Sequence, residues 1–223
     1  MKELICKITS IRNFGSKKVF TIDKVLSTIK PGQFLLASNS VLDSHLVPVY
    51  LFSLRGDIYF SFPEESSWDI GSVLNIRGPI GDGFVDINLF QNILLINFES
   101  SHHTLNALME IGIMNKKNIA YFSEKKEFQI PPTVELVAPN LLSETIHWAD
   151  FIGIEIHREN LSKYHEFFQQ IEKQRTHCEL MVFCPILCSG KSDCMICSLK
   201  TKKGWIKTCQ QGQIINLNQL EFE

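Results

Sequence analysis

Residues 78–98, GPIGDGFVDINLFQNILLINF, contain the point at which the pattern of the chain changes. Before them, short segments rich in Ile, Val, Phe and Leu are separated by turn-forming residues, which predicts a small antiparallel barrel. From Asn92–Phe98 onward, short apolar runs alternate with stretches of helical spacing. Such alternation predicts a parallel sheet covered by helices. We therefore expect two parts that join near residue 90.

The expected elements follow from this pattern. In the first part we expect strands at Leu4–Ile11, Lys18–Ile22, Gln33–Ala37, Val47–Ser53, Asp57–Phe62 and Val73–Arg77. In the second part we expect strands at Asn92–Phe98, Asn118–Phe122, Val134–Val137, Phe151–Ile156 and Leu180–Phe183, and helices at about His103–Ile113 and Leu161–Ile171. The predicted fold is a six-stranded antiparallel barrel (1–90), a reduced parallel α/β domain (91–180) and a cysteine-containing tail (181–223).

Composition and charge exclude several classes of protein. The 223 residues include 22 basic and 24 acidic side chains, a formal charge of −2, which argues against nucleic-acid binding by a basic face. No apolar stretch is long enough for a membrane span, and the first ten residues lack the apolar run of a signal peptide. We expect a cytoplasmic protein. No hydrolase motif or phosphate-binding loop is present, so no catalytic residue is predicted.

The tail carries the strongest chemical signal. Five of the seven cysteines lie between Cys184 and Cys209, and clustered thiols in a reducing compartment indicate metal rather than disulfides. Cys188, Cys194, Cys197 and Cys209 are separated by five, two and eleven residues. Plant-type [2Fe–2S] sites use gaps of four and two residues and a distant fourth cysteine. These four cysteines are the predicted cluster ligands, with Cys209 returned to the others by a hairpin over residues 195–209.

Other interpretations of the tail remain open. A structural zinc site also uses four cysteines, usually as two close pairs. Cys184 could replace Cys188 or Cys209 in the ligand set, or could simply pack in the interior. The lysines of the tail (Lys191, Lys200, Lys202, Lys203 and Lys207) could dock an acidic partner, or form an ordinary solvated face.

The order of these parts resembles a known family. Gly78–Phe84 (GPIGDGF) is similar to the G-P-L-G-x-G-F junction of the electron-transfer subunits of heterotetrameric dihydroorotate dehydrogenases, in the ferredoxin-reductase-like superfamily. The tail, which closes with Cys209–Ile215, loosely matches that family's cysteine hairpin. The resemblance extends over the whole chain.

The resemblance implies a role in electron transport and pyrimidine biosynthesis. Electrons would pass from a flavin in a dihydroorotate dehydrogenase-like catalytic subunit, through the [2Fe–2S] cluster, to FAD in the barrel and on to NAD. The chain would then be one subunit of a hetero-oligomeric oxidoreductase. The resemblance also implies that Pro48, Val49 and Tyr50 contact the flavin ring. It further implies that Gly78, Pro79 and Gly81 allow the backbone to approach a cofactor or a neighbouring domain closely.

The chain departs from the family where cofactors bind. Val47 stands where the family has a phosphate-binding arginine, which leaves FAD binding open. Residues 97–103, NFESSHH, contain no glycine, so we do not expect NAD to bind in the usual mode. In residues 97–103 we expect Ser100 or Ser101 to cap the helix that follows, and His102 and His103 to be exposed. In a later strand we expect Ile154–His157 to be half exposed, because apolar and polar residues alternate there. The alternative function is a cluster-only or zinc-bound assembly subunit that has lost both nucleotide sites.

Overall fold

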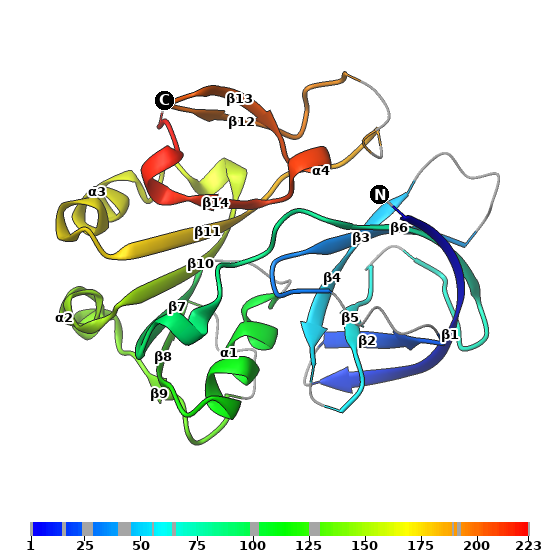
Figure 1. Cartoon of the computed structure of the whole chain (residues 1–223), viewed down its shortest axis with the longest axis horizontal. Helices are drawn as coiled ribbons and strands as arrows, with labels where there is room; N and C mark the ends of the chain where they lie inside the picture. The colour runs from blue at the N-terminus through cyan, green and yellow to red at the C-terminus, as the bar shows by residue number, and fades with distance from the viewer. Residues whose placement is uncertain are drawn as a thin grey trace.

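The structure is a computed structural model of the 223-residue chain. It describes residues 2–14, 17–23, 29–39, 46–54, 56–63, 66–98, 103–124, 130–188, 190 and 193–222. Two bodies lie side by side, a barrel formed by the N-terminal part and a sheet with helices formed by the C-terminal part (Figure 1). Among the helices within these ranges, none is both long and apolar enough to cross a membrane.

The N-terminal part is the predicted antiparallel barrel. Its six strands are β1 (Lys2–Phe14), β2 (Lys17–Ile22), β3 (Phe34–Ser38), β4 (Val47–Ser53), β5 (Tyr59–Ser61) and β6 (Val73–Ile80). They close in the order β1-β2-β5-β4-β3-β6. Apolar side chains such as Phe20, Leu51, Phe60 and Leu74 fill the interior. Burying each such side chain stabilises the folded barrel by about 1.5–3 kcal/mol. The inward positions of the strands are therefore apolar, and this pattern is visible in the sequence.

The C-terminal part is a mixed six-stranded sheet in the order β14-β11-β10-β7-β8-β9. The strands are β7 (Asn92–Phe98), β8 (Asn118–Ser123), β9 (Glu135–Leu136), β10 (Phe151–His157), β11 (His177–Phe183) and β14 (Ile214–Asn216). The first five are parallel, as predicted. β14 comes from the tail and pairs antiparallel with β11. This three-residue strand has too little apolar pattern of its own to be recognised without its partner.

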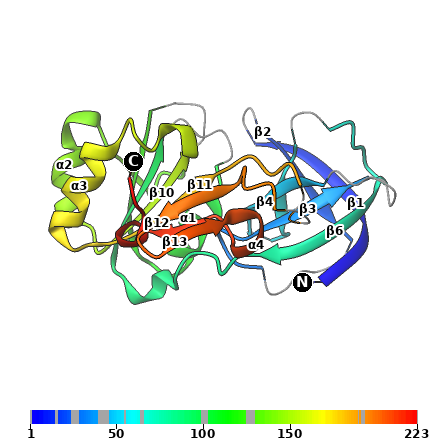
Figure 2. The same cartoon turned by 90° about the horizontal axis from the view of Figure 1, so that it is seen from above.

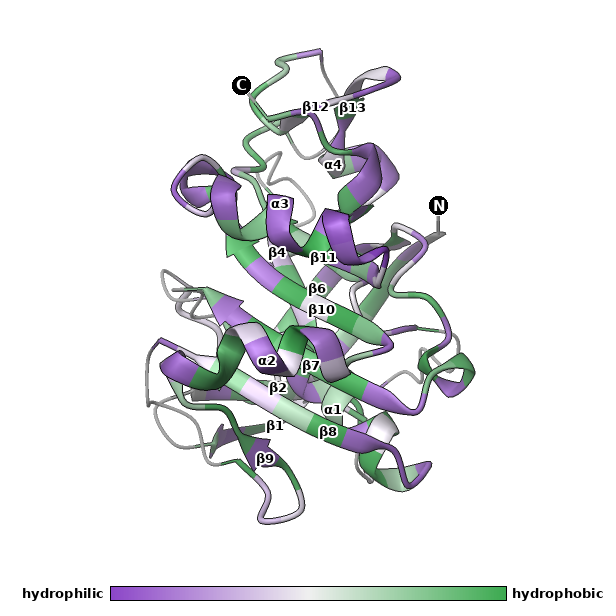
Figure 3. Cartoon of the chain, turned by 90° about the vertical axis from the view of Figure 1, so that its left-hand side faces the viewer, coloured by the Kyte–Doolittle hydropathy of each residue, from purple (hydrophilic) through white to green (hydrophobic). Residues whose placement is uncertain are grey.

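Helices cover both faces of this sheet. Helix α1 (Leu105–Met114) lies between the sheet and the barrel, whereas α2 (Leu142–Trp148) and α3 (His165–Gln174) lie on the opposite face (Figures 1 and 3). The α3 helix begins four residues later than expected. Short 3-10 helices occupy Ile87–Leu89, Pro139–Leu141, Arg158–Asn160 and Leu217–Gln219.

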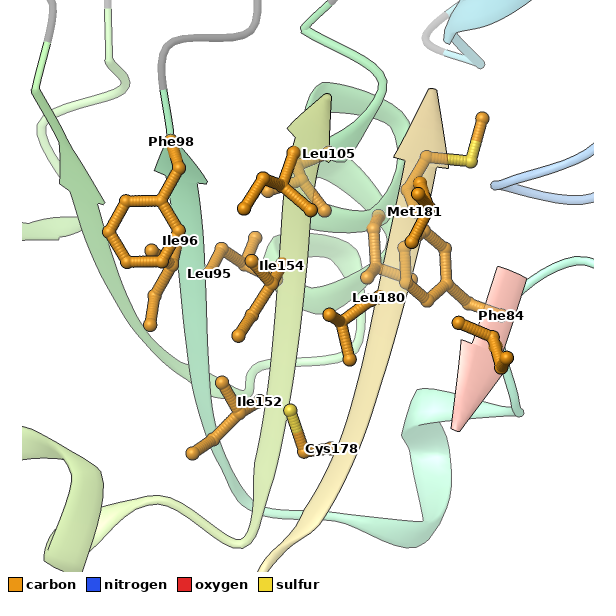
Figure 4. Packing of buried hydrophobic residues seen from close by; sticks show 14 of the residues in the cluster. Phe84, Leu95, Ile96, Phe98, Leu105, Ile152, Ile154, Cys178, Leu180 and Met181 are labelled. Atoms are coloured by element: carbon orange, nitrogen blue, oxygen red, sulfur yellow. The ribbon is translucent and has the colours of Figure 1, made fainter. Parts of the chain in front are cut away.

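The core of the sheet is continuous with the junction to the barrel. Figure 4 shows side chains from β7, β10 and β11, with Leu105 of α1, packed beside Phe84 of the GPIGDGF segment. Cys178 is 1% exposed within this cluster, so its thiol has a packing role.

The tail packs against both the barrel and the sheet. β12 (Ser198–Thr201) and β13 (Gly204–Lys207) form a hairpin, and α4 (Thr208–Gln211) follows directly. Seen from above, these elements lie across the junction of the two bodies (Figure 2). The tail then ends as β14 and a 3-10 turn, so the cysteine segment begins and ends at the same edge of the sheet.

Candidate functional site

The predicted hairpin brings two of the predicted ligands together. Ser198 pairs with Lys207 at the open end of β12 and β13, which places Cys197 opposite the start of α4. Cys197 and Cys209 are 2% and 1% exposed, and their Sγ atoms lie 3.1 Å apart. Cys209 itself lies in α4, just beyond the strand on which it was expected.

Thr208 fixes this pair of thiols. Its backbone N–H and its hydroxyl both donate to the carbonyl oxygen of Cys197, at 3.2 and 3.0 Å. Thr208 is fully buried, so water does not compete for these bonds. On the other side, the Arg158 guanidinium donates to the carbonyls of Ile196 and Ser198. The backbone on both sides of Cys197 is therefore held by hydrogen bonds.

Cys188 lies close to the same thiols. The pKa of Cys209 is raised to about 12, mainly by burial and in addition by the neighbouring thiols of Cys197 and Cys188. A thiolate here is repelled by other thiolates unless a cation compensates them, and a bound metal ion provides that compensation.

Gly190, between Cys188 and Cys197 in the sequence, lies close to Cys209. Gly190 has φ +71°, and a Cβ on it would lie 3.2 Å from the carbonyl oxygen of Cys209 and 3.9 Å from its Sγ. Met195 also has a left-handed backbone, with φ +57°. A glycine is needed at position 190 for both conformation and space.

The fourth predicted ligand lies apart from the others. Cys194 is exposed, and its neighbours 189, 191 and 192 lie outside the described residues. Within the described ranges, no three His, Cys, Asp or Glu side chains form a group that could hold a metal ion. The structure thus brings Cys197 and Cys209 together, with Cys188 close to them, and leaves Cys194 at the surface.

Cys184 lies near the same group of thiols. It is 5% exposed just beyond the end of β11, and its side chain makes a hydrogen bond with Thr208. Burial is the main cause that raises its pKa to about 11, and Cys197 acts in the same direction. Its position leaves both predicted roles open, a ligand and an interior thiol.

The lysines of the hairpin have acidic neighbours in the same chain. Lys200 pairs with Glu221 at 3.3 Å, Lys202 with Glu172 at 3.5 Å, and Lys207 with Asp193. Lys191 lies outside the described residues. These pairs are exposed and worth little energetically, but they reduce the net positive charge of the hairpin.

The strand predicted to meet a flavin is covered by the chain itself. Val49 is fully buried, and Tyr50 is 3% exposed. The Tyr50 ring packs against Phe34 and edge-on against Phe183, with centroids 5.8 and 5.1 Å apart. Burial raises the pKa of Tyr50 well above its ordinary value, partly offset by the nearby Gln213 amide. Pro48, half-buried, pairs with Leu36 on the neighbouring strand β3.

The glycines of the GPIGDGF segment approach other parts of the protein. A Cβ on Gly81 would lie 2.8 Å from the Cα of Gly212, and a Cβ on Gly78 would lie 2.8 Å from the Leu35 side chain. Pro79, between them, is half-buried after a cis peptide bond. Close packing within the chain accounts for both glycines. Contact of Pro48, Val49, Tyr50, Gly78, Pro79 or Gly81 with a cofactor stays a prediction.

Comparison with solved structures identifies the fold. A chain of NADH-dependent reduced ferredoxin–NADP oxidoreductase, described in connection with flavin-based electron bifurcation, matches with a TM-score of 0.70 and 11% identity, over 98% of this chain and 90% of that one. The ferredoxin reductase of carbazole 1,9a-dioxygenase, in its FAD apo form, matches with a TM-score of 0.59 and 12% identity over 82% and 68%. The chain has a ferredoxin-reductase-like fold.

A third match agrees with this assignment. The ferredoxin–NADP+ reductase of Plasmodium falciparum gives a TM-score of 0.54 at 9% identity, over 81% of this chain and 96% of that one. No family model matches the sequence, and no curated protein matches it. The TM-scores establish the shared fold, and at identities this low the matches establish the fold alone.

At the expected nucleotide position of this fold, two sequence expectations were wrong. His103 is 5% exposed and has φ +51°, and Glu155 is fully buried. The Glu155 carboxylate accepts hydrogen bonds from His103 N, Thr104 Oγ1 and Leu105 N, at 3.1, 2.9 and 3.2 Å. The alternation of apolar and polar residues in Ile154–His157 predicted a half-exposed strand. The prediction was wrong because β10 lies between two other strands and both of its faces are covered.

The start of α1 was also placed incorrectly. The helix begins after Thr104, and Ser100, Ser101 and His102 lie outside the described residues. A charged residue inside the otherwise apolar run Phe151–Ile156 was the available signal for a buried carboxylate, because such a residue in a central strand must find internal donors.

Proposed function

We propose that this chain is an iron–sulfur electron carrier whose [2Fe–2S] cluster is held by Cys188, Cys194, Cys197 and Cys209. The observation that carries the proposal is the 3.1 Å approach of the Cys197 and Cys209 Sγ atoms. Two buried thiols this close, on separate segments, form half of a four-thiol site, and the Cys188 thiol lies next to Cys209.

The donor chemistry suits such a cluster. Thiolates are the ligands of two-iron clusters, which exchange single electrons when bound. Gly190 lets the loop pass close to Cys209, and the Arg158 and Thr208 hydrogen bonds hold Cys197 in place. Cys194 is exposed, and in the proposed site it would turn inward to the cluster. Metal binding commonly orders its own ligands in this way.

The barrel residues do not fit a flavin ring as they stand. The Tyr50 ring is covered by Phe34 and Phe183, and Val47 offers no charge to a phosphate. Flavin is named in connection with two of the matched structures, and their fold is shared. The proposed function of this chain nevertheless uses no flavin of its own, and the electrons enter and leave through the cysteine centre.

The proposed partner is a flavin-bearing catalytic subunit similar to dihydroorotate dehydrogenase. Support comes from the GPIGDGF junction followed in order by an α/β domain and a cysteine tail. Substrate chemistry would occur in that subunit, and this chain would act within a hetero-oligomer. Co-purification with the catalytic subunit encoded in the same genome tests the pairing, and a chain that stays alone at micromolar concentrations would contradict it.

The metal content decides between iron–sulfur and zinc. We expect anaerobically purified protein to contain about two irons per chain, with visible absorption that bleaches on dithionite reduction. Single Cys→Ser changes at positions 188, 194, 197 and 209 should each lower the iron content. Cys178→Ser is the matched control for positions 197 and 209, since Cys178 is equally buried but lies on β11 in the sheet.

Two results would overturn the proposal. A colourless protein that holds zinc after anaerobic preparation would make the tail a structural site and the chain a scaffold subunit. Iron retained in the Cys209→Ser variant but lost from Cys184→Ser would mean that the ligand set is wrong. Flavin released by acid from the same sample would show that Tyr50 and Phe183 separate to admit FAD.

A further inference from the structure

The parallel sheet has one position at which a ligand would be expected. In open α/β sheets, ligands bind beyond the carboxyl ends of the strands, where the strand order reverses. Here β7 is followed along the chain by β8 on one side, and β10 lies on its other side. The reversal therefore lies between β7 and β10, next to the start of α1.

A side chain of the protein fills this position. Glu155, near the carboxyl end of β10, is fully buried, and its two carboxylate oxygens accept from two backbone N–H groups and one hydroxyl at the beginning of α1. These N–H groups are the donors that a helix N-terminus offers to a phosphate. His103 holds a left-handed backbone, which directs its N–H to the carboxylate.

We infer that the Glu155 carboxylate takes the place of a bound phosphate, so that Glu155 closes the α/β domain to pyridine dinucleotides. The donors are already used, and a second anion brought beside a buried carboxylate would meet strong repulsion. Asn97, 2% exposed on β7, lies beside Glu155 in the sheet register, which leaves the crevice filled from both strands.

Tyr121 is a buried neighbour of Glu155. It lies on β8, is 5% exposed, and pairs in register with Leu95 of β7. Its pKa is raised to about 12, mainly by burial and in addition by the nearby Glu155 carboxylate.

The inference goes beyond the cysteine centre and does not depend on it. The metal content of the tail and the anion chemistry at Glu155 are measured separately, so either conclusion can fail alone.

The test uses the full chain and small anions. Wild type should show no saturable change in fluorescence or thermal midpoint with NADH, NADPH or ADP. Glu155→Ala removes the atoms of an acetate ion. We expect its lowered thermal midpoint to rise again with sodium acetate or inorganic phosphate, relative to sodium chloride at equal ionic strength, because a ligand that binds only the folded state stabilises it.

A partly buried carboxylate of α1 itself provides the control. Glu110, in the middle of the helix and away from its N-terminus, accepts from Ser53 Oγ, Leu54 N and Asn106 Nδ2. Glu110→Ala should also lower the midpoint, with no recovery in acetate or phosphate beyond that of wild type.

Three outcomes would overturn the inference. The first is saturable NADH binding by wild type. The second is that acetate or phosphate raises the thermal midpoint of Glu155→Ala no more than that of Glu110→Ala. The third applies if Glu155→Ala does not fold, and is a Glu155→Gln variant with the thermal midpoint of wild type. The last would show that the negative charge at this position is not needed.

Discussion

The contact between Gly81 and Gly212 connects the barrel to the tail that carries Cys209. A Cβ at position 81 would lie 2.8 Å from the Cα of Gly212, whereas carbon atoms in contact normally stay at least about 3.5 Å apart. In Gly81→Ala, the backbone at residue 212 must therefore retreat by about 0.7 Å, the difference between the two distances. Overpacking of this kind costs about 1–3 kcal/mol.

A second glycine separates this clash from backbone strain. Gly81 and Gly71 both have φ +90°, but a Cβ on Gly71 would meet nothing within 4 Å. Both Ala variants pay the conformational cost of positive φ, about 1–2 kcal/mol, and only Gly81→Ala adds the clash. We expect the free energy of unfolding of Gly81→Ala to be lower than that of Gly71→Ala by about 1–3 kcal/mol.

Urea denaturation followed by far-UV circular dichroism measures this difference. Because Gly212 directly follows α4, the same displacement should reach Cys209, and Gly81→Ala should also hold less iron than Gly71→Ala. Equal stability of the two variants, within about 0.5 kcal/mol, would refute the close approach and return Gly81 to a ligand-binding role.

Three other predictions follow from the described contacts. Glu110→Ala, which leaves the Ser53 hydroxyl and the Leu54 N–H without their acceptor, should lower the free energy of unfolding by about 1–3 kcal/mol, measured in urea. Tyr121 has its pKa raised from 10.0 to about 12, so the unfolded chain loses this proton first. The contribution of Tyr121 to stability should be constant below pH 10 and fall between pH 10 and 12, by up to about 1.4 kcal/mol per pH unit, and Tyr121→Phe should remove that part of the slope. Removal of metal by an anaerobic chelator should leave far-UV circular dichroism within a few per cent of its starting value, and a cooperative loss of helix and strand would contradict a pre-folded site.

The strands could be predicted because their apolar side chains fill closed interiors. Each barrel strand was recognisable from composition and flanking turns, and the parallel strands of the sheet from continuous apolar runs. The hairpin over residues 195–209 was also recognisable, because Lys202-Lys203-Gly204 marks a turn between two short apolar segments. The local sequence pattern was sufficient to predict an element wherever that element and its turn are contiguous in the sequence.

Contacts between distant segments could not be predicted in the same way. Glu155 looked half exposed because alternation describes one strand, whereas its burial depends on the strands at either side. Tyr50 could face a ligand or the core, and only the position of Phe183, on another body of the molecule, decides that its ring is covered. The Gly81–Gly212 approach joins residues separated by most of the chain.

The position of the tail explains why Cys197 and Cys209 lie together in the folded chain. β11 ends at Phe183, and the chain returns beside it as β14, where Leu180 pairs with Ile215 and Val182 N donates to Gln213 O. The sheet therefore holds both ends of the cysteine segment, and strand pairing offsets the entropy of closing this long loop. A small zinc module, in contrast, obtains most of its folding free energy from the metal. If the tail holds the proposed cluster, the fold should therefore persist when the metal is removed.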